Sequence, residues 1–248
     1  MERKYNKTPI IEALCEFQFV PSQPWDITIP GRIYEKIKDD FPEKRQQVGL
    51  GIQFRPTEKG LEHKVESVPP RMQFFSKEKT LLVQIGSDLL VVNRLKPYNT
   101  WHQFRLEILK HLEIYEDIAT PKGFKRIGLR YINKINIKSL SVKLEDYFNL
   151  YPNIPEDIPQ MHTRFLNRIE IPYEHDRDKM LLTLGSTTPE DTNTVSMILD
   201  LDYILSKPEG IPLDKTEEWL ENAHSSIYEV FESCIKEKSR ILFGEVKK

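Results

Sequence analysis

The sequence predicts an α+β protein with a mainly antiparallel sheet and two long helices on one face of that sheet. Two segments, 11–19 and 127–135, alternate apolar and polar residues as half-buried strands do. Each is followed by a short helix-like segment, several strand-like segments and a long amphipathic segment. This repeated order indicates a duplicated strand–helix–strands–helix unit, with halves at residues 1–120 and 121–248 packed as one compact unit.

The first half begins with a strand at about residues 10–20, in which apolar side chains face one side and Glu12 and Glu16 the other. Pro30 suits the first turn of a helix over about 30–40. The next strands are expected at 48–54, 72–76, 81–85 and 89–95, with a loop at 56–70 and a hairpin turn at 86–88. Asn99 or Thr100 can cap the long helix that follows, whose apolar stripe is Trp101, Phe104, Ile108, Leu112 and Tyr115.

The second half begins after the turn-forming residues at 120–123. Its elements are expected to be a strand at 124–138, a short helix at 142–150, strands at 162–173, 179–187 and 194–205, and a helix at 213–237. Asp214 can cap that last helix, and we expect Trp101 and Trp219 to lie in comparable, largely buried places. Such a sheet would resemble the saddle of the TATA-binding protein, or two helix-grip units side by side.

Composition excludes several classes of protein. Of the 248 residues, 39% are hydrophobic and 30% charged, which is typical of a folded chain rather than a disordered one. The net charge of -2 provides no overall attraction to nucleic acid or to anionic membranes. Cys15 and Cys234 form no Cys-x-x-Cys pair, and the sequence has neither a signal-peptide pattern nor a membrane-length apolar run. We therefore expect a cytoplasmic protein.

Several segments together resemble one family. They are Pro9-Ile10-Ile11-Glu12-Ala13 with Glu16, Asn93-Arg94-Leu95 leading to Tyr98, Trp101 and Phe104, Arg126-Ile127-Gly128-Leu129-Arg130-Tyr131-Ile132-Asn133, and Leu199-Asp200-Leu201-Asp202 with His224 and Phe231. The whole chain resembles the prokaryotic proteins catalogued as "sporadically distributed", most specifically in the string at 126–133. The resemblance implies no known activity and no catalytic residue. Patchy distribution implies an accessory role, such as phage defence or mobile-element biology.

Charged residues recur at spacings of two or four along the predicted strands, which places each set on one face of the sheet. We take these as candidate partner-binding residues: Glu12, Glu16, Arg126, Arg130, Lys134, Arg164, Arg168, Asp200 and Asp202. If the helices cover the opposite face, these groups form either a solvated surface of cross-strand ion pairs or a binding surface.

Motifs for nucleophilic catalysis, phosphate loops, dinucleotide binding and zinc ligation do not occur in the sequence. We therefore favour a non-enzymatic binding or scaffold protein without a cofactor. Its expected ligand is a partner protein, ideally the product of a neighbouring gene, and homodimerisation stays open.

Two alternatives remain. The five cationic residues among the candidates could bind nucleic-acid phosphates if the strands at 124–138 and 162–173 adjoin. The weaker alternative is a divalent-metal nuclease, with Glu12, Asp200 and Asp202 as carboxylate ligands.

Overall fold

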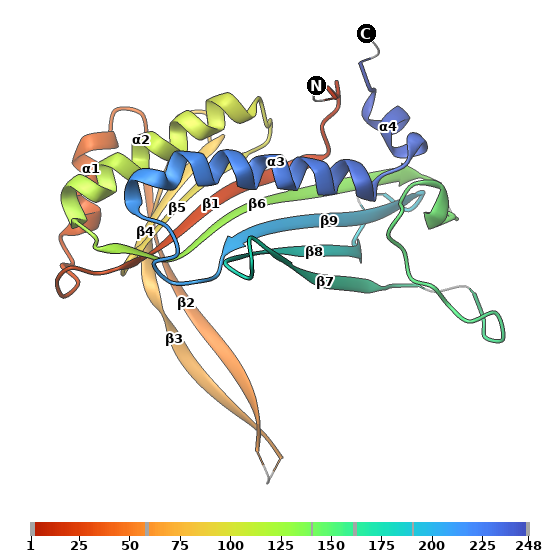
Figure 1. The fold of residues 1–248 in the computed structure, drawn as a ribbon, viewed down its shortest axis with the longest axis horizontal. Helices are drawn as coiled ribbons and strands as arrows, with labels where there is room; N and C mark the ends of the chain where they lie inside the picture. Colours follow the sequence, from red (N-terminus) through yellow and green to blue (C-terminus); the bar gives the residue numbers. More distant parts are fainter. Residues whose placement is uncertain (1–2, 58–59, 140, 161–162, 190, 247–248) are drawn as a thin grey trace.

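Alternating apolar residues in the strands bury one face of a single sheet against the long helices (Figure 1). The structure is a computed structural model that describes residues 3–57, 60–139, 141–160, 163–189 and 191–246. For residues 48–57 and 60–69 it describes the backbone alone. The α+β class and the antiparallel sheet are confirmed.

The sheet has nine strands in the order β2-β3-β4-β5-β1-β6-β9-β8-β7, and all neighbours are antiparallel. The strands are β1 (Ile10–Val20), β2 (Glu43–Thr57), β3 (Gly60–Phe75), β4 (Leu81–Gly86), β5 (Leu89–Leu95), β6 (Gly123–Lys138), β7 (Leu166–Tyr173), β8 (Asp178–Thr187) and β9 (Thr194–Leu205). The predicted strands at 10–20, 81–85, 89–95, 124–138, 179–187 and 194–205 are therefore confirmed.

The strand order is mirrored about the central pair β1 and β6. Outward from β1 the order is β5, β4, β3 and β2, and outward from β6 it is β9, β8 and β7. In each half the first strand lies at the centre of the sheet and the last strand pairs with it. Both halves therefore share one continuous sheet.

The predicted loop at 56–70 is wrong for residues 56–57 and 60–70, which lie in a long hairpin of β2 and β3, whereas 58–59 lie outside the described residues. Thr57 pairs with Gly60, and a register shift between Gln47 and Gly49 takes up the Pro69-Pro70 segment. The sequence predicted a loop because prolines and charged residues weaken the strand propensity of this segment. In the structure, backbone hydrogen bonds between the two strands outweigh that weak propensity. The hairpin projects from the sheet on the side away from the helices (Figure 1).

The helices are α1 (Ile29–Ile37), α2 (Trp101–Ala119), α3 (Thr216–Cys234) and α4 (Glu237–Phe243), with 3-10 turns η1 (Leu144–Asp146) and η2 (Leu213–Lys215). Thr100 caps α2, since its side-chain oxygen accepts from the Gln103 amide at 3.3 Å. Asp214 does not cap α3: it lies in η2, and the N-cap residue of α3 is Lys215, whose side chain makes no capping hydrogen bond. No helix in the described part of the chain is long and apolar enough to cross a membrane.

The structure differs from the prediction at two helices, and the physical reason is the same for both. The helix predicted at 142–150 is only the turn η1, and the helix predicted at 213–237 is interrupted at Ile235, whose backbone is extended. Phe148 and Ile235 form an antiparallel bridge, and Lys236 donates from its amide to the Tyr147 carbonyl at 2.8 Å. Pairing between two distant segments thus replaces helical hydrogen bonds in both.

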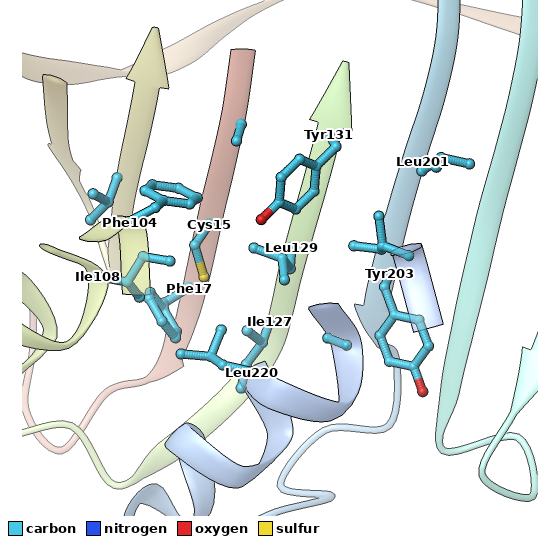
Figure 2. Packing of buried hydrophobic residues seen from close by; sticks show 14 of the residues in the cluster. Cys15, Phe17, Phe104, Ile108, Ile127, Leu129, Tyr131, Leu201, Tyr203 and Leu220 are labelled. Carbon is cyan, nitrogen blue, oxygen red and sulfur yellow. The ribbon is translucent and has the colours of Figure 1, made fainter. Parts of the chain in front are cut away.

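The core lies between the sheet and the two long helices, which are on the same face as predicted (Figure 1). Figure 2 shows Cys15 and Phe17 of β1 beside Phe104 and Ile108 of α2. Ile127, Leu129 and Tyr131 of β6, Leu201 and Tyr203 of β9 and Leu220 of α3 continue this layer. Trp219 is 2% exposed, and Trp101 is half-buried and packs against the same core, so Trp101 is the more exposed of the two tryptophans.

Candidate binding surface on the open sheet face

The helices α2 and α3 cover one face of the sheet, and we call the opposite face the open face (Figure 1). It carries charged side chains on the three neighbouring central strands β1, β6 and β9. The register places Arg130 of β6 between Leu14 of β1 and Asp202 of β9. Seven of the predicted residues lie together there, and we call them the open-face cluster: Glu12, Glu16, Arg126, Arg130, Lys134, Asp200 and Asp202.

Arginine–carboxylate contacts organise this cluster across the strands. Arg130 donates from Nε and Nη2 to the two oxygens of Asp200 at 2.8 and 2.5 Å. Arg126 donates to Glu16 at 2.7 Å and to Asp202 at 3.4 Å, and so links β1 with β9 across β6. Charge-assisted contacts of this kind hold both guanidinium groups in fixed orientations.

Gly128 makes room for the Arg126 guanidinium. A Cβ at Gly128 would lie 3.0 Å from Arg126 Nη1 and 3.1 Å from Nη2, so the guanidinium occupies the space above the glycine. Gly128 is the partner of Glu16 in the β1–β6 register. The string at 126–130 therefore has a physical reason for its glycine, which is close approach by a neighbouring side chain.

A chain of side-chain hydrogen bonds, which we call the amide chain, extends from Glu12 across the rest of the first half. Asn93 donates to Glu12 at 2.6 Å and accepts from Gln84 at 2.9 Å. Gln73 donates to both Gln84 and Gln47, at 3.2 and 3.0 Å. The amide chain thus joins β1, β5, β4, β3 and β2 on the open face.

The sequence analysis did not select the amides of this chain as site residues. A single amide on a strand has no diagnostic spacing, and only the strand order places the four amides in a row. The available signal was that Asn93 follows four apolar residues in the strand Leu89–Leu95, and a polar residue that is buried there needs a hydrogen-bond partner.

Asp202 is the carboxylate of this surface whose ionisation is most affected by its surroundings. Burial raises the pKa of Asp202 to about 6, and the nearby Arg126 and Arg130 oppose that rise only in part. Its side chain is 14% exposed. The charge of the open-face cluster therefore changes near pH 6.

Apolar side chains lie between these charges. Leu14, Ile132, Ile198 and Leu181 are half-buried residues on the same face, on β1, β6, β9 and β8. Ile132 pairs with Asp200, and Leu181 pairs with Asp202. The open face is therefore a mixed surface, in which ion pairs alternate with partly exposed hydrocarbon.

Arg164 and Arg168 do not belong to the cluster. The predicted strand at 162–173 is β7 over 166–173, and β9 and β8 lie between it and β6. Arg168 lies on the edge strand opposite Thr183, and Arg164 precedes the strand. The adjoining basic strands required by the nucleic-acid hypothesis are thus not present, because the pairing order separates them.

The carboxylates do not form a metal site. Within the part of the chain that the structure describes, no three His, Cys, Asp or Glu side chains are grouped to hold a metal ion. Asp200 and Asp202 are instead directed to Arg130 and Arg126. The metal-nuclease hypothesis therefore has no ligand set at Glu12, Asp200 and Asp202.

A pocket of about 390 Å³ opens where the open face meets the ends of β1 and the β4–β5 turn. Arg71 and Lys125 contribute positive charge to its wall, and Asp88 contributes a carboxyl whose pKa burial raises. Gln18 belongs both to this wall and to the open face, since it pairs with Arg126 and donates to Glu16 at 2.8 Å. The pocket is thus continuous with the open-face cluster.

A second polar group lies on the helix side of the sheet. The Tyr131 hydroxyl is 3.0 Å from that of Tyr98 and 3.2 Å from Nδ1 of His224, and the His224 ring stacks on Trp101 at 4.3 Å. Burial lowers the pKa of His224 to about 4. Trp101 in turn donates to Glu221 at 3.0 Å. These contacts tie α2, α3 and β6 together, which is a structural role.

Comparison with known proteins adds no function. No family model matches the chain, and no curated protein matches it in sequence. The resemblance to the "sporadically distributed" proteins therefore stays a prediction.

Proposed function

We propose that this chain is a non-enzymatic binding or scaffold protein whose open sheet face engages a partner protein. The observation that carries the proposal is the open-face cluster together with the half-buried Leu14, Ile132, Ile198 and Leu181. Interface cores combine apolar contacts with polar groups that have fixed orientations. A surface whose side chains are already ordered loses less entropy when a partner binds.

The charges of the open face favour a protein over nucleic acid. The cluster contains four carboxylates and three cations, and both arginines already contact carboxylates. A polyanion would be repelled by Glu12, Glu16 and Asp200 and would have to displace these contacts. A partner protein can supply charges of both signs as well as apolar side chains.

The test is affinity capture with the purified protein as bait, followed by titration of the captured partner. Ile132→Lys places a charge in the middle of the open face and should weaken binding at least about tenfold. Leu106→Lys is the matched control, since Leu106 is 50% exposed on α2, on the other side of the molecule. Equal affinity of the wild type and Ile132→Lys for a stoichiometric partner would exclude the open face as the binding surface.

We propose that residues 1–120 and 121–248 arose by duplication, which the mirrored strand order supports. Homologues whose two halves carry unrelated sequence profiles would contradict this.

The accessory role in phage defence or mobile elements and the cytoplasmic location stay predictions. Loss of phage resistance on deletion of the gene, and fractionation of the expressed protein, test them.

A further inference from the structure

The strand β7 forms one edge of the sheet and has an exposed outer side. It is last in the strand order, and in the described part of the chain its only pairing partner is β8. Leu166 is 74% and Ile169 is 38% exposed, and Arg168 and Glu170 are also exposed. An exposed edge with apolar side chains can pair with a further strand.

The backbone groups that point outward can be derived from the β7–β8 ladder. The Ser186 amide donates to the Phe165 carbonyl at 3.0 Å, which makes these two residues a hydrogen-bonded pair in the register that continues to Leu166 and Gly185. Such pairs alternate along an antiparallel ladder, so odd-numbered residues of β7 bond to β8. The even-numbered residues 166, 168, 170 and 172 therefore direct their backbone groups to the outer side.

Pro172 agrees with this assignment. It has no amide hydrogen, and it falls at one of the outward positions, where β8 does not need a donor. A proline at an odd-numbered position would have removed a hydrogen bond from the existing ladder. The outer side thus offers amide donors at residues 166, 168 and 170 and carbonyl acceptors at residues 166, 168, 170 and 172.

We propose that two copies of this chain associate edge to edge through β7, antiparallel and centred on Ile169. In this register Arg168 lies opposite Glu170 of the second copy, and Glu170 lies opposite Arg168 of the second copy. These are outward-facing residues, so each pair can exchange two backbone hydrogen bonds as well as an ion pair. The two sheets then become one, and Ile169 packs against Ile169 of the second copy.

Charge selects this register over its neighbours. Moving the centre by one residue places Arg168 opposite Arg168, or Glu170 opposite Glu170, and like charges directly opposite are unfavourable. Glu170 accepts from Lys179 at 2.8 Å within its own chain, yet its side chain is 58% exposed and retains a free side for a second cation. The described part of the chain offers Arg168 no carboxylate partner within ion-pair distance.

This association is independent of the proposed partner protein, because β9 and β8 separate β7 from β6 and the centre of the open-face cluster. Two short strands bury little area, so we expect a dimer with a dissociation constant of about micromolar. Outward from the contact between the two β7 strands, the strand order is then the same in both copies. The open faces of both copies lie on the same side of the joined sheet.

The test is sedimentation velocity of the full chain over a range of concentrations. The wild type should shift from the mass of a monomer to that of a dimer. Arg168→Glu should raise the dissociation constant at least about tenfold, because two carboxylates would then lie opposite each other at both contact points. The double variant Arg168→Glu with Glu170→Arg restores opposite charges and should recover the dimer. Lys77→Glu, at an exposed turn residue far along the chain from β7, is the matched control.

Recovery in the charge-swapped chain cannot result from a general effect on folding, because both substitutions remain exposed. A wild type that stays monomeric up to about millimolar concentration overturns the proposal. So does a dimer that Arg168→Glu leaves unchanged, since that dimer would use another surface. Failure of partner capture, in contrast, bears only on the open face.

Discussion

Arg130 on β6 and Asp200 on β9 contact each other at two points across neighbouring strands, with Nε–Oδ1 and Nη2–Oδ2 distances of 2.8 and 2.5 Å. Asp200 is 15% exposed, whereas Arg130 is 39% exposed. The arginine thus covers a carboxylate that has little access to water. The primary role of Arg130 is therefore structural, because it pairs with a carboxylate that water reaches only in part.

Arg130→Ala should lower the free energy of unfolding by about 1 kcal/mol, because it leaves Asp200 without its two-point partner. For a chain of this size that corresponds to a melting temperature about 2–4 °C lower. Arg130→Lys should recover only part of the loss, since an ammonium group cannot make the planar two-point contact. Differential scanning calorimetry measures both, with Lys77→Ala as an exposed control; unchanged melting in Arg130→Ala would refute the role.

We expect the basic residues not to bind nucleic acid. Any affinity of the protein for nucleic acid should therefore stay the same when Arg130 and Arg164 are replaced by alanine. Arg130 is engaged by Asp200, and Arg164 precedes a strand that two others separate from β6. Two lost phosphate contacts would flatten the log–log salt dependence of binding to duplex DNA by roughly two units. We expect no such change when Arg130→Ala and Arg164→Ala are combined. Fluorescence anisotropy with a labelled duplex at several salt concentrations decides, and a flattened slope would revive the alternative.

Asp202 should make the protein less stable as the pH rises from about 4 to 6. Its folded pKa of about 6 lies above the ordinary 3.8, so in this interval the native state binds more protons than the unfolded state. Asp202→Asn mimics the protonated form and should gain up to about 3 kcal/mol relative to the wild type across the interval. Urea unfolding at pH 4, 5, 6 and 7 measures the difference.

Asp200→Asn is the matched control for this experiment, because it removes a carboxylate from the same strand face and retains Asp202. The control should keep the wild-type trend between pH 4 and 6. A constant difference between Asp202→Asn and the wild type at all four pH values would contradict the raised pKa.

His111 and His224 should make the protein less stable as the pH falls, which is the opposite of the effect of Asp202. Burial lowers both pKa values to about 4, below the 6.5 of an exposed histidine. Their contribution is therefore complete above pH 6.5 and is lost as the pH falls toward 4. Histidine NMR signals, assigned with His111→Gln and His224→Gln, should remain those of neutral rings at pH 5. A ring that titrates near 6.5 would place that side chain in contact with water.

The two cysteines should be unreactive in the native protein. Cys15 is 0% and Cys234 is 6% exposed, and burial raises the pKa of both thiols, to about 11 for Cys234. Thiolate is the reactive species, so a disulfide reagent at pH 8 should label neither residue until the chain unfolds. Labelling of Cys15 under native conditions would reveal opening of the layer between β1 and the helices.

Local periodicity in the sequence determined the elements that bury one face. The alternation at 10–20 and 124–138 and the apolar stripe from Phe104 to Tyr115 each predicted the correct element and the correct buried side. These patterns are reliable because the positions that face the core must be apolar, whichever element covers them. The continuation of the β2–β3 hairpin through residues 56–57 and 60–70 and the interruption at Ile235 had no local pattern, since pairing with another segment produces both.

For the candidate site, the sequence by itself determined which side chains share a strand face: spacings of four placed Glu12 with Glu16, and Arg126 with Arg130. The tertiary structure alone decided which strands are neighbours. It brought Asp200 to Arg130, joined Asn93 to Glu12, and left Arg168 on a separate edge. The physical reason is that cross-strand contacts reach only adjacent strands, about 4.8 Å apart, and adjacency depends on long-range pairing that no local pattern encodes.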